Sequence, residues 1–244
     1  MAEKSEKWRK NMETNMCPSE MKNYLICQME HFFPDRQTNK YFQGKDVEQA
    51  IQVAYERMEN CFKVLTNAAY SNEDGQTFFN YLHADQYATF LYFFSNYLWN
   101  TSGNKLICDK ALQLNRVLNN LFLSYKCKLP DIFYLAHPMG SIIGNADYSD
   151  YLVISQGVTI NTGTSIDGKL TPKIGKAVYL ATGAKIIGNE EIGNRVTVGV
   201  DAVVYKRKIE DGKLVIRDET GEIVIKENIK FVQQEYFRTD ISQD

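Results

Sequence analysis

Histidine is the side chain that most often moves protons near neutral pH, and this chain of 244 residues contains three histidines. They are His31, His83 and His137. A hydroxyl group is too weakly acidic to ionise alone at pH 7, so an enzyme that uses one as a nucleophile needs such a base. A general-base histidine in this chain would therefore be one of these three.

The cysteines could form disulfide bonds or bind zinc, and their number and spacing favour neither. There are five of them, an odd number, and no two form a C-x-x-C pair. Such a set favours reduced, buried structural thiols in a cytoplasmic protein over a disulfide framework or a zinc site. We therefore expect no metal site.

Charge and hydropathy exclude two classes of partner. Lys and Arg total 28 against 30 Asp and Glu, a formal net charge of −2, and no basic patch stands out. We expect neither a nucleic-acid nor a membrane partner. The longest uncharged stretch, residues 86–104, contains too short an apolar segment to span a bilayer, and residues 1–22 alternate in charge, unlike a signal peptide.

Composition changes abruptly near Pro130, which indicates two architectures. Before it, glycine is rare and the apolar spacing predicts helices over residues 47–65, 86–99 and 105–125. We therefore predict an α-helical N-terminal domain over residues 1–129.

After Pro130 an apolar residue, aliphatic in ten of eleven cases, recurs at every sixth position, with one two-residue shift after Ile166. A period of six fits a chain that makes a short strand, turns and repeats. Each coil then has three flat faces, each face contributes one inward residue, and successive coils stack about 4.8 Å apart. This predicts a β-helix over residues 130–207. The predicted inward positions are Ile142, Tyr148, Ile154, Ile160, Ile166, Ile174, Leu180, Ile186, Ile192, Val198 and Val204.

Two interruptions of the repeat predict features outside the regular coils. Between Ile166 and Ile174 the spacing is two residues too long, which predicts a loop that leaves the prism, and loops on rigid scaffolds often carry binding groups. After Val204, residues 213–217 and 222–226 flank a turn and predict a β-hairpin. Residues 208–244 would then form a hairpin and a C-terminal tail.

Four strings in the second half resemble the serine acetyltransferase branch of the hexapeptide-repeat acyltransferases. They are His137-Pro-Met-Gly-Ser-Ile-Ile-Gly144, Val153-Ile-Ser-Gln-Gly-Val-Thr-Ile160, Pro172-Lys-Ile-Gly175 and Ala181-Thr-Gly-Ala-Lys-Ile-Ile-Gly-Asn189. The resemblance implies an α+β protein in which a helical domain precedes a left-handed parallel β-helix. It also implies an acetyl-CoA-dependent O-acetyltransferase.

The resemblance assigns catalytic roles. His137 would accept the proton of an acceptor hydroxyl while its oxygen attacks the thioester of acetyl-CoA, and a carboxylate would orient the imidazole. In the family that carboxylate belongs to an upstream Asp-Ile dipeptide, which Asp131-Ile132 matches with a shorter spacing to the histidine. Asp131 is therefore the expected partner of His137.

Two departures from the family concern the acceptor. The residue before His137 is Ala136, where the family has an Asp that helps to hold the ammonium group of serine, and Thr171 replaces a second histidine. A sugar or another small hydroxylated molecule thus competes with serine as the expected acceptor. Asp85, in the polar cluster His83-Ala-Asp85, and Thr171 are the expected acceptor contacts, although Asp85 could simply stabilise a helix N-terminus.

The resemblance places acetyl-CoA between adjacent prisms of a homotrimer, or of a dimer of trimers. Ala181, Gly183 and Gly199 would let the pantetheine arm approach the backbone, and Lys185 would meet a phosphate. The family's complex with a cysteine-synthesis enzyme uses a tail that ends in isoleucine. This sequence ends in Ser242-Gln243-Asp244, so we do not expect that partner.

Two other functions remain open from sequence. One is acetylation of a sugar or amino sugar in polysaccharide biosynthesis, where the base is similar. The other is a non-catalytic β-helix scaffold with the helices as its binding part.

Overall fold

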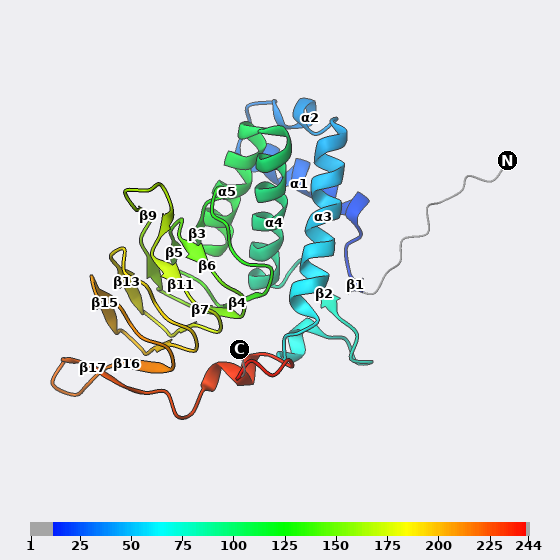
Figure 1. The fold of residues 1–244 in the computed structure, drawn as a ribbon. Helices are drawn as coiled ribbons and strands as arrows, with labels where there is room; N and C mark the ends of the chain where they lie inside the picture. Colours follow the sequence, from blue (N-terminus) through cyan, green and yellow to red (C-terminus); the bar gives the residue numbers. More distant parts are fainter. Residues whose placement is uncertain (1–11, 243–244) are drawn as a thin grey trace.

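The computed structural model describes residues 12–242, in which a helical region precedes a stack of short strands (Figure 1). The predicted N-terminal domain begins at residue 1, so its first eleven residues lie outside the described part. The elements of the helical region are α1 (Pro18–Phe32), α2 (Thr38–Tyr41), α3 (Lys45–Phe62), α4 (Ala84–Ser102), α5 (Lys105–Asn119), the 3-10 helix η1 (Ala68–Tyr70) and the strand pair β1 (Glu13–Thr14) and β2 (Phe78–Phe79).

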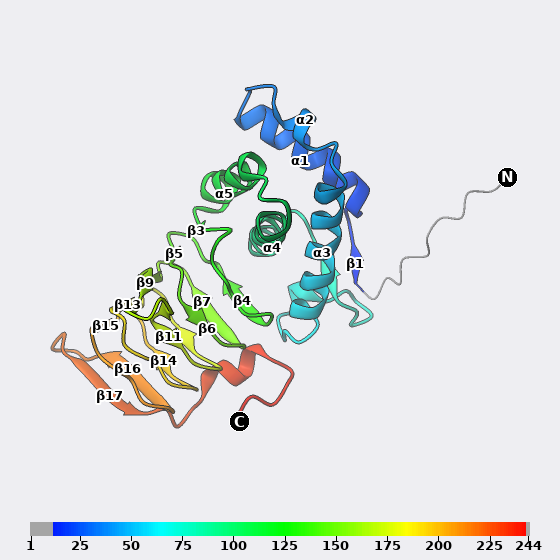
Figure 2. The ribbon, with the colours of Figure 1, turned by 45° about the horizontal axis from the view of Figure 1, so that its top comes forward.

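Helix α4 forms the centre of the helical region, and α3 and α5 lie on either side of it (Figure 2). The three predicted helices correspond to α3, α4 and α5. Helix α5 ends at Asn119, earlier than the predicted residue 125. The reason is local: Asn120 adopts a left-handed conformation with φ of 49°, and the next residues join a sheet.

The β-helix is built from short parallel strands on three faces. Its strands are β3 (Phe122–Leu123), β4 (Phe133–Ala136), β5 (Ile142–Ile143), β6 (Asp147–Tyr148), β7 (Leu152–Ser155), β8 (Thr159–Ile160), β11 (Lys173–Ile174), β12 (Tyr179–Leu180), β13 (Lys185–Ile187), β14 (Thr197–Val198) and β15 (Val203–Tyr205). One face has the order β15-β13-β8-β5-β3, the second contains β14-β12-β7-β4, and the third begins with β11-β6. Because β3 pairs with β5, the first prism strand lies before residue 130.

Nine of the eleven predicted inward positions are buried, and two predictions were wrong. Ile142 is 51% exposed, whereas its neighbour Ile143 is buried and pairs with Ile160. A slip of one residue turns a side chain to the other face of a strand. Ile166 is fully exposed because it lies in the loop outside the prism.

The predicted loop is longer than the sequence repeat indicated. The inward residues Ile160 and Ile174 are fourteen positions apart, against six in a regular coil. The intervening segment forms a small antiparallel hairpin of β9 (Gly163–Thr164) and β10 (Leu170–Thr171) that projects from the corner (Figure 1).

The C-terminal segment confirms the predicted hairpin and adds a connection. Strands β16 (Lys213–Arg217) and β17 (Ile223–Glu227) are antiparallel, and β16 extends the sheet beside β14. The chain then runs back along the outer face of β12 and β14 through the 3-10 helix η2 (Val232–Tyr236), reaching the end of α3 (Figure 2). There the Arg238 amide donates to the Val64 carbonyl and the Arg238 Nε donates to the Leu65 carbonyl.

The five cysteines are free thiols. Cys61, Cys108 and Cys127 are buried, whereas Cys17 is half-buried and Cys27 is exposed, so the expectation of buried thiols does not hold for these last two residues. No helix within residues 12–242 combines the length and apolarity needed to cross a membrane.

Gln233 is the buried polar anchor of the tail, and its removal should destabilise the protein. Its Nε2 donates to the Ala177 carbonyl at 3.0 Å, and its Oε1 accepts from the Thr197 hydroxyl at 3.0 Å. We expect Gln233→Ala to lower the free energy of unfolding by about 1–3 kcal/mol, because both partners lose a buried hydrogen bond. Urea denaturation measures this. Gln156→Ala, at an exposed site, is the control, and equal midpoints for the two variants would contradict the assignment.

Candidate active site

His137 lies at the corner between β4 and β5, where its backbone adopts an uncommon conformation. Its φ is 51°, in the left-handed region that few residues other than glycine enter. Its side chain is 70% exposed. The ring of His137 is therefore open to solvent at this corner.

The partner of His137 is Asp85 and not the predicted Asp131. The Asp85 Oδ2 accepts from the His137 Nδ1 at 3.0 Å and from the His137 backbone amide at 3.1 Å. Asp131 precedes β4 whereas His137 follows it, and six residues of extended chain span roughly 20 Å. Asp131 is exposed and makes no contact with His137.

Asp85 is positioned by the first turn of α4. Its side chain is only 5% exposed, and the positive end of the helix stabilises a carboxylate there. Two phenols approach this buried carboxylate. Burial raises the pKa of Tyr70 well above its usual value, and Tyr134 and Asp85 raise it further. Burial likewise raises the pKa of Tyr134. Both hydroxyls therefore stay neutral beside Asp85.

His83 belongs to the same cluster but has a different environment. It is the N-cap residue of α4, and its ring meets the ring of Tyr70 edge-on at 5.6 Å. Its Nδ1 is buried and has no hydrogen-bond partner within residues 12–242. His31 lies in the last turn of α1, beside Phe32. Of the three histidines, His137 alone has a carboxylate bonded to its ring among the described residues.

This geometry allows His137 to accept a proton at Nε2. A carboxylate that accepts from Nδ1 holds the neutral ring in the tautomer whose Nε2 carries a lone pair. Because the ring is exposed, Nε2 is open to a small molecule. The same carboxylate would stabilise the imidazolium that forms on proton uptake.

The four expected cofactor-binding residues gather near one corner of the prism, below His137 in the stack of coils. Ala181 and Gly183 form the corner after β12, and Lys185 begins β13, where its Nζ donates to the Gly183 carbonyl at 2.8 Å. Gly199 lies at the same corner one coil further on. All four thus lie close to one another in the chain fold.

Thr171 is placed at a different corner. It ends β10 in the projecting hairpin, and its hydroxyl donates to the Asn189 Oδ1 at 3.0 Å. The five-stranded face separates this corner from that of His137, so the structure does not bring Thr171 and His137 together within one chain. Within residues 12–242, no three His, Cys, Asp or Glu side chains gather to hold a metal ion.

Sequence comparison finds distant relatives. The chain is 29% identical over 113 residues to a serine acetyltransferase from Mycobacterium tuberculosis, covering 46% of this chain and 49% of that protein. It is 30% identical over 126 residues to a serine acetyltransferase from Staphylococcus aureus, covering 51% of this chain and 58% of the relative. The chain thus spans about half the length of these relatives. No protein-family model matches the sequence.

Structure comparison extends the likeness to most of the chain. A serine acetyltransferase from Neisseria gonorrhoeae superposes with a TM-score of 0.63 at 18% identity, covering 93% of this chain and 83% of that one. A serine acetyltransferase in complex with CoA superposes with a TM-score of 0.53 at 16% identity, covering 85% and 100%. The chain resembles serine acetyltransferases in both sequence and fold. The resemblance found in the sequence strings, and the predicted order of helical region and β-helix, are confirmed.

The pairing of Asp85 with His137 can be tested by the tautomer of the ring. We expect the neutral ring of His137 to carry its proton on Nδ1, because Asp85 accepts from that nitrogen. In Asp85→Ala both tautomers should be populated. Two-bond proton–nitrogen NMR spectra of the imidazole distinguish the two forms. Asp131→Ala is the matched control and should leave the spectrum unchanged; a change in that variant alone would reverse the assignment.

Proposed function

We propose that the chain is an acetyl-CoA-dependent O-acetyltransferase in which His137 is the general base and Asp85 orients it. The observation that carries this proposal is the 3.0 Å contact between the buried Asp85 carboxylate and the Nδ1 of an exposed histidine ring. The likeness to serine acetyltransferases supplies the reaction class.

The reaction divides the work between the acceptor and the base. The Nε2 of His137 takes the proton of the acceptor hydroxyl as that oxygen attacks the thioester carbonyl. The carbon–sulfur bond then breaks, the acetyl group stays on the acceptor oxygen, and the imidazolium returns the proton to the leaving sulfur of CoA. Asp85 stabilises the positive ring between these two steps.

The corner below His137 supports the predicted site for acetyl-CoA. Gly140, Gly157 and Gly183 lie at successive levels of this corner, each with a positive φ, and they leave a strip without side chains. A Cβ at Gly183 would approach the Asp201 Oδ1 to 2.0 Å. The pantetheine arm could follow this strip past Ala181, Gly183 and Gly199, with Lys185 available to a phosphate.

The unequal faces of the prism support assembly as a homotrimer. The tail covers one face, where Tyr236 packs against Tyr134 and Tyr179. A second face is charged, with Lys173 bonded to Glu191 at 3.0 Å. The third, five-stranded face ends in exposed apolar side chains, among them Tyr205. Packing the β15 end of this face against a second copy would bury Tyr205 and enclose the strip, while the β3 end stays outside the contact.

The acceptor contacts need revision in one respect. Both donors of His137 bind the Asp85 Oδ2, so Asp85 serves the base and is not the expected contact for the acceptor. Thr171 can reach an acceptor only across a subunit boundary. With Ala136 in place of an acidic residue, sugars and other small hydroxylated molecules remain alternatives to serine, and an amino sugar would use the same base.

Removal of the base tests the proposal directly. We expect His137→Ala to lower the rate of acetyl-CoA consumption by a hundredfold or more, the scale that a general base contributes. The assay should offer serine, simple sugars and amino-nucleotide sugars as acceptors, which also separates O- from N-acetylation. His31→Ala, remote from the pair, is the control; unchanged activity in His137→Ala would refute the proposed mechanism.

Donor binding separates the enzyme from a scaffold. Acetyl-CoA at a hundred times its dissociation constant should stabilise the folded chain by about 2.7 kcal/mol, because it binds only the native state. Thermal unfolding with and without acetyl-CoA measures this effect. The same shift should persist in His137→Ala, since the base does not hold the donor. Absence of any shift in the unmodified chain would instead favour the non-catalytic scaffold.

A further inference from the structure

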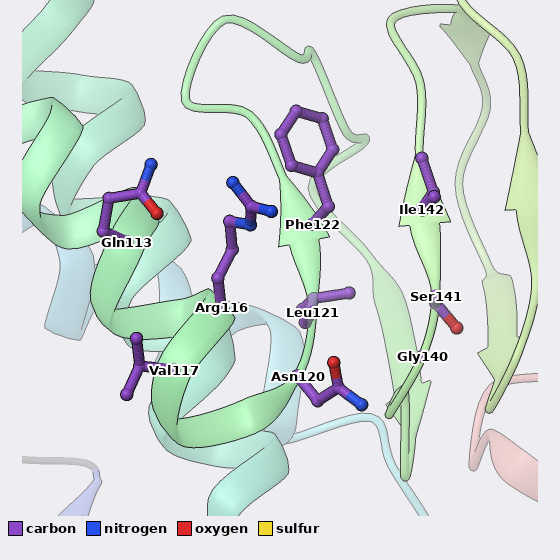
Figure 3. Close-up of a pocket in the computed structure, with 9 residues that line it drawn as sticks. All are labelled: Gln113, Arg116, Val117, Asn120, Leu121, Phe122, Gly140, Ser141 and Ile142. Atoms are coloured by element: carbon purple, nitrogen blue, oxygen red, sulfur yellow. The ribbon is translucent and has the colours of Figure 1, made fainter.

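A groove of about 520 Å³ lies between the end of α5 and the first strands of the prism. Figure 3 shows that one wall comes from α5 and the other from the segments that contain β3 and β5. Its lining combines apolar and polar side chains. The lining residues are Gln113, Arg116, Val117, Asn120, Leu121, Phe122, Gly140, Ser141 and Ile142.

Among the residues that the structure describes, Arg116 is the only charged one that lines this groove. Its guanidinium lies over the ring of Phe122, 5.7 Å from the centroid, which is a cation–π geometry. Within residues 12–242 it makes no ion pair and no hydrogen bond. The side chains of Gln113 and Asn120 likewise lack hydrogen-bond partners in the described part of the chain. The groove thus holds one positive charge and two carboxamides that are available to a ligand.

The position of Arg116 near the end of a helix offers a simpler explanation. Basic side chains in the last turn often bond the free carbonyls there and stabilise the helix dipole. Here, however, the guanidinium bonds none of these carbonyls and extends along the groove toward Phe122 (Figure 3). Stacking on an aromatic ring leaves the planar edge of a guanidinium free to bind an anion.

The groove adjoins the candidate base. Gly140, on its rim, follows His137 by three residues, and its amide donates to the Asn120 carbonyl at 2.8 Å. The Ser141 amide donates to the Pro138 carbonyl at 3.1 Å, which closes a tight turn. The ends of such a turn lie within about 7 Å of each other. A small molecule in the groove can therefore extend to the corner that carries His137.

We propose that this groove binds the anionic group, a carboxylate or a phosphate, of a small hydroxylated molecule through the guanidinium of Arg116. Gln113 and Asn120 provide further hydrogen bonds, while Phe122 and Ile142 contact the carbon skeleton. The identification of this molecule as the acceptor rests on the proposed function, whereas the anion site does not. An acceptor without a negative charge would leave the guanidinium unpaired and would bind less tightly.

Three probes share one carbon skeleton and differ only in charge: glycerol, glycerate and glycerol 3-phosphate. Calorimetric titration should show that at least one anion binds the unmodified chain about tenfold more tightly than glycerol, or better, since a charge-assisted bidentate contact is worth that much. Arg116→Gln should remove this preference. Lys126→Gln removes an equal charge outside the groove, where Lys126 lies over Trp99, and should preserve it.

The two anions distinguish a carboxylate site from a phosphate site.

Equal binding of all three probes by the unmodified chain would overturn the inference, as would an anion preference that survives Arg116→Gln. A change of molecular mass in Arg116→Gln but not in Lys126→Gln, measured by light scattering, would overturn it too, because the groove would then be a subunit contact.

The inference and the proposed function can fail separately. If Arg116→Gln loses anion binding but the unmodified chain consumes no acetyl-CoA with any probe or acceptor, the anion site is supported and the proposed acetyltransferase activity is refuted. If His137→Ala loses turnover but Arg116→Gln keeps the preference for anions, the proposed acetyltransferase activity is supported and the anion site is refuted.

Discussion

Each coil of the prism hydrogen-bonds to the coils before and after it, and this stacking determines where every other feature lies. Parallel strands share one register, so the corners of successive coils lie one above another. Inward aliphatic side chains such as Ile154, Leu180 and Val198 fill the interior and prevent a shift of register. Chemistry is confined to the corners and the outer faces, because the interior has no space for a ligand.

The helical region is held against this prism by buried polar contacts as well as apolar packing. Asn96 of α4 donates to the carbonyls of Tyr125 and Cys127, and the Tyr92 hydroxyl donates to the Cys127 carbonyl at 2.8 Å. The Cys61 thiol of α3 donates to the Phe133 carbonyl, and burial raises its pKa to about 12. Such directional bonds are unfavourable unless both partners are in place, so they restrict how α3 and α4 lie on β4.

The sequence repeat predicted the prism well because each inward position is a local requirement of one coil. The errors arose where a residue left the repeat. Ile142 and Ile143 are both aliphatic, and only the pairing of β5 with β8 decides which one faces inward. Ile166 matched the period by chance inside a projecting hairpin. A period of six cannot reveal either case, since it contains no information about pairing between coils.

The pairing of Asp85 with His137 was not predictable for a related reason. The two residues are 52 positions apart and belong to different architectures, so no local pattern connects them. Asp131 was expected because Asp131-Ile132 matches the Asp-Ile dipeptide of the family. The extended strand β4 lies between Asp131 and His137 and keeps them apart, although they are close in sequence.

A carboxylate on α4 has a physical consequence that one within the prism would lack. Its geometry toward the ring depends on how the helical region lies on the β-helix, because Asp85 belongs to α4 whereas His137 follows β4. The ring and the backbone amide of His137 both bond the same oxygen of Asp85, so a shift of that oxygen changes both bonds at once. A small displacement of α4 would weaken both bonds together. The buried hydrogen bonds of Asn96 and Tyr92 therefore support the base indirectly, because they hold α4 against the prism.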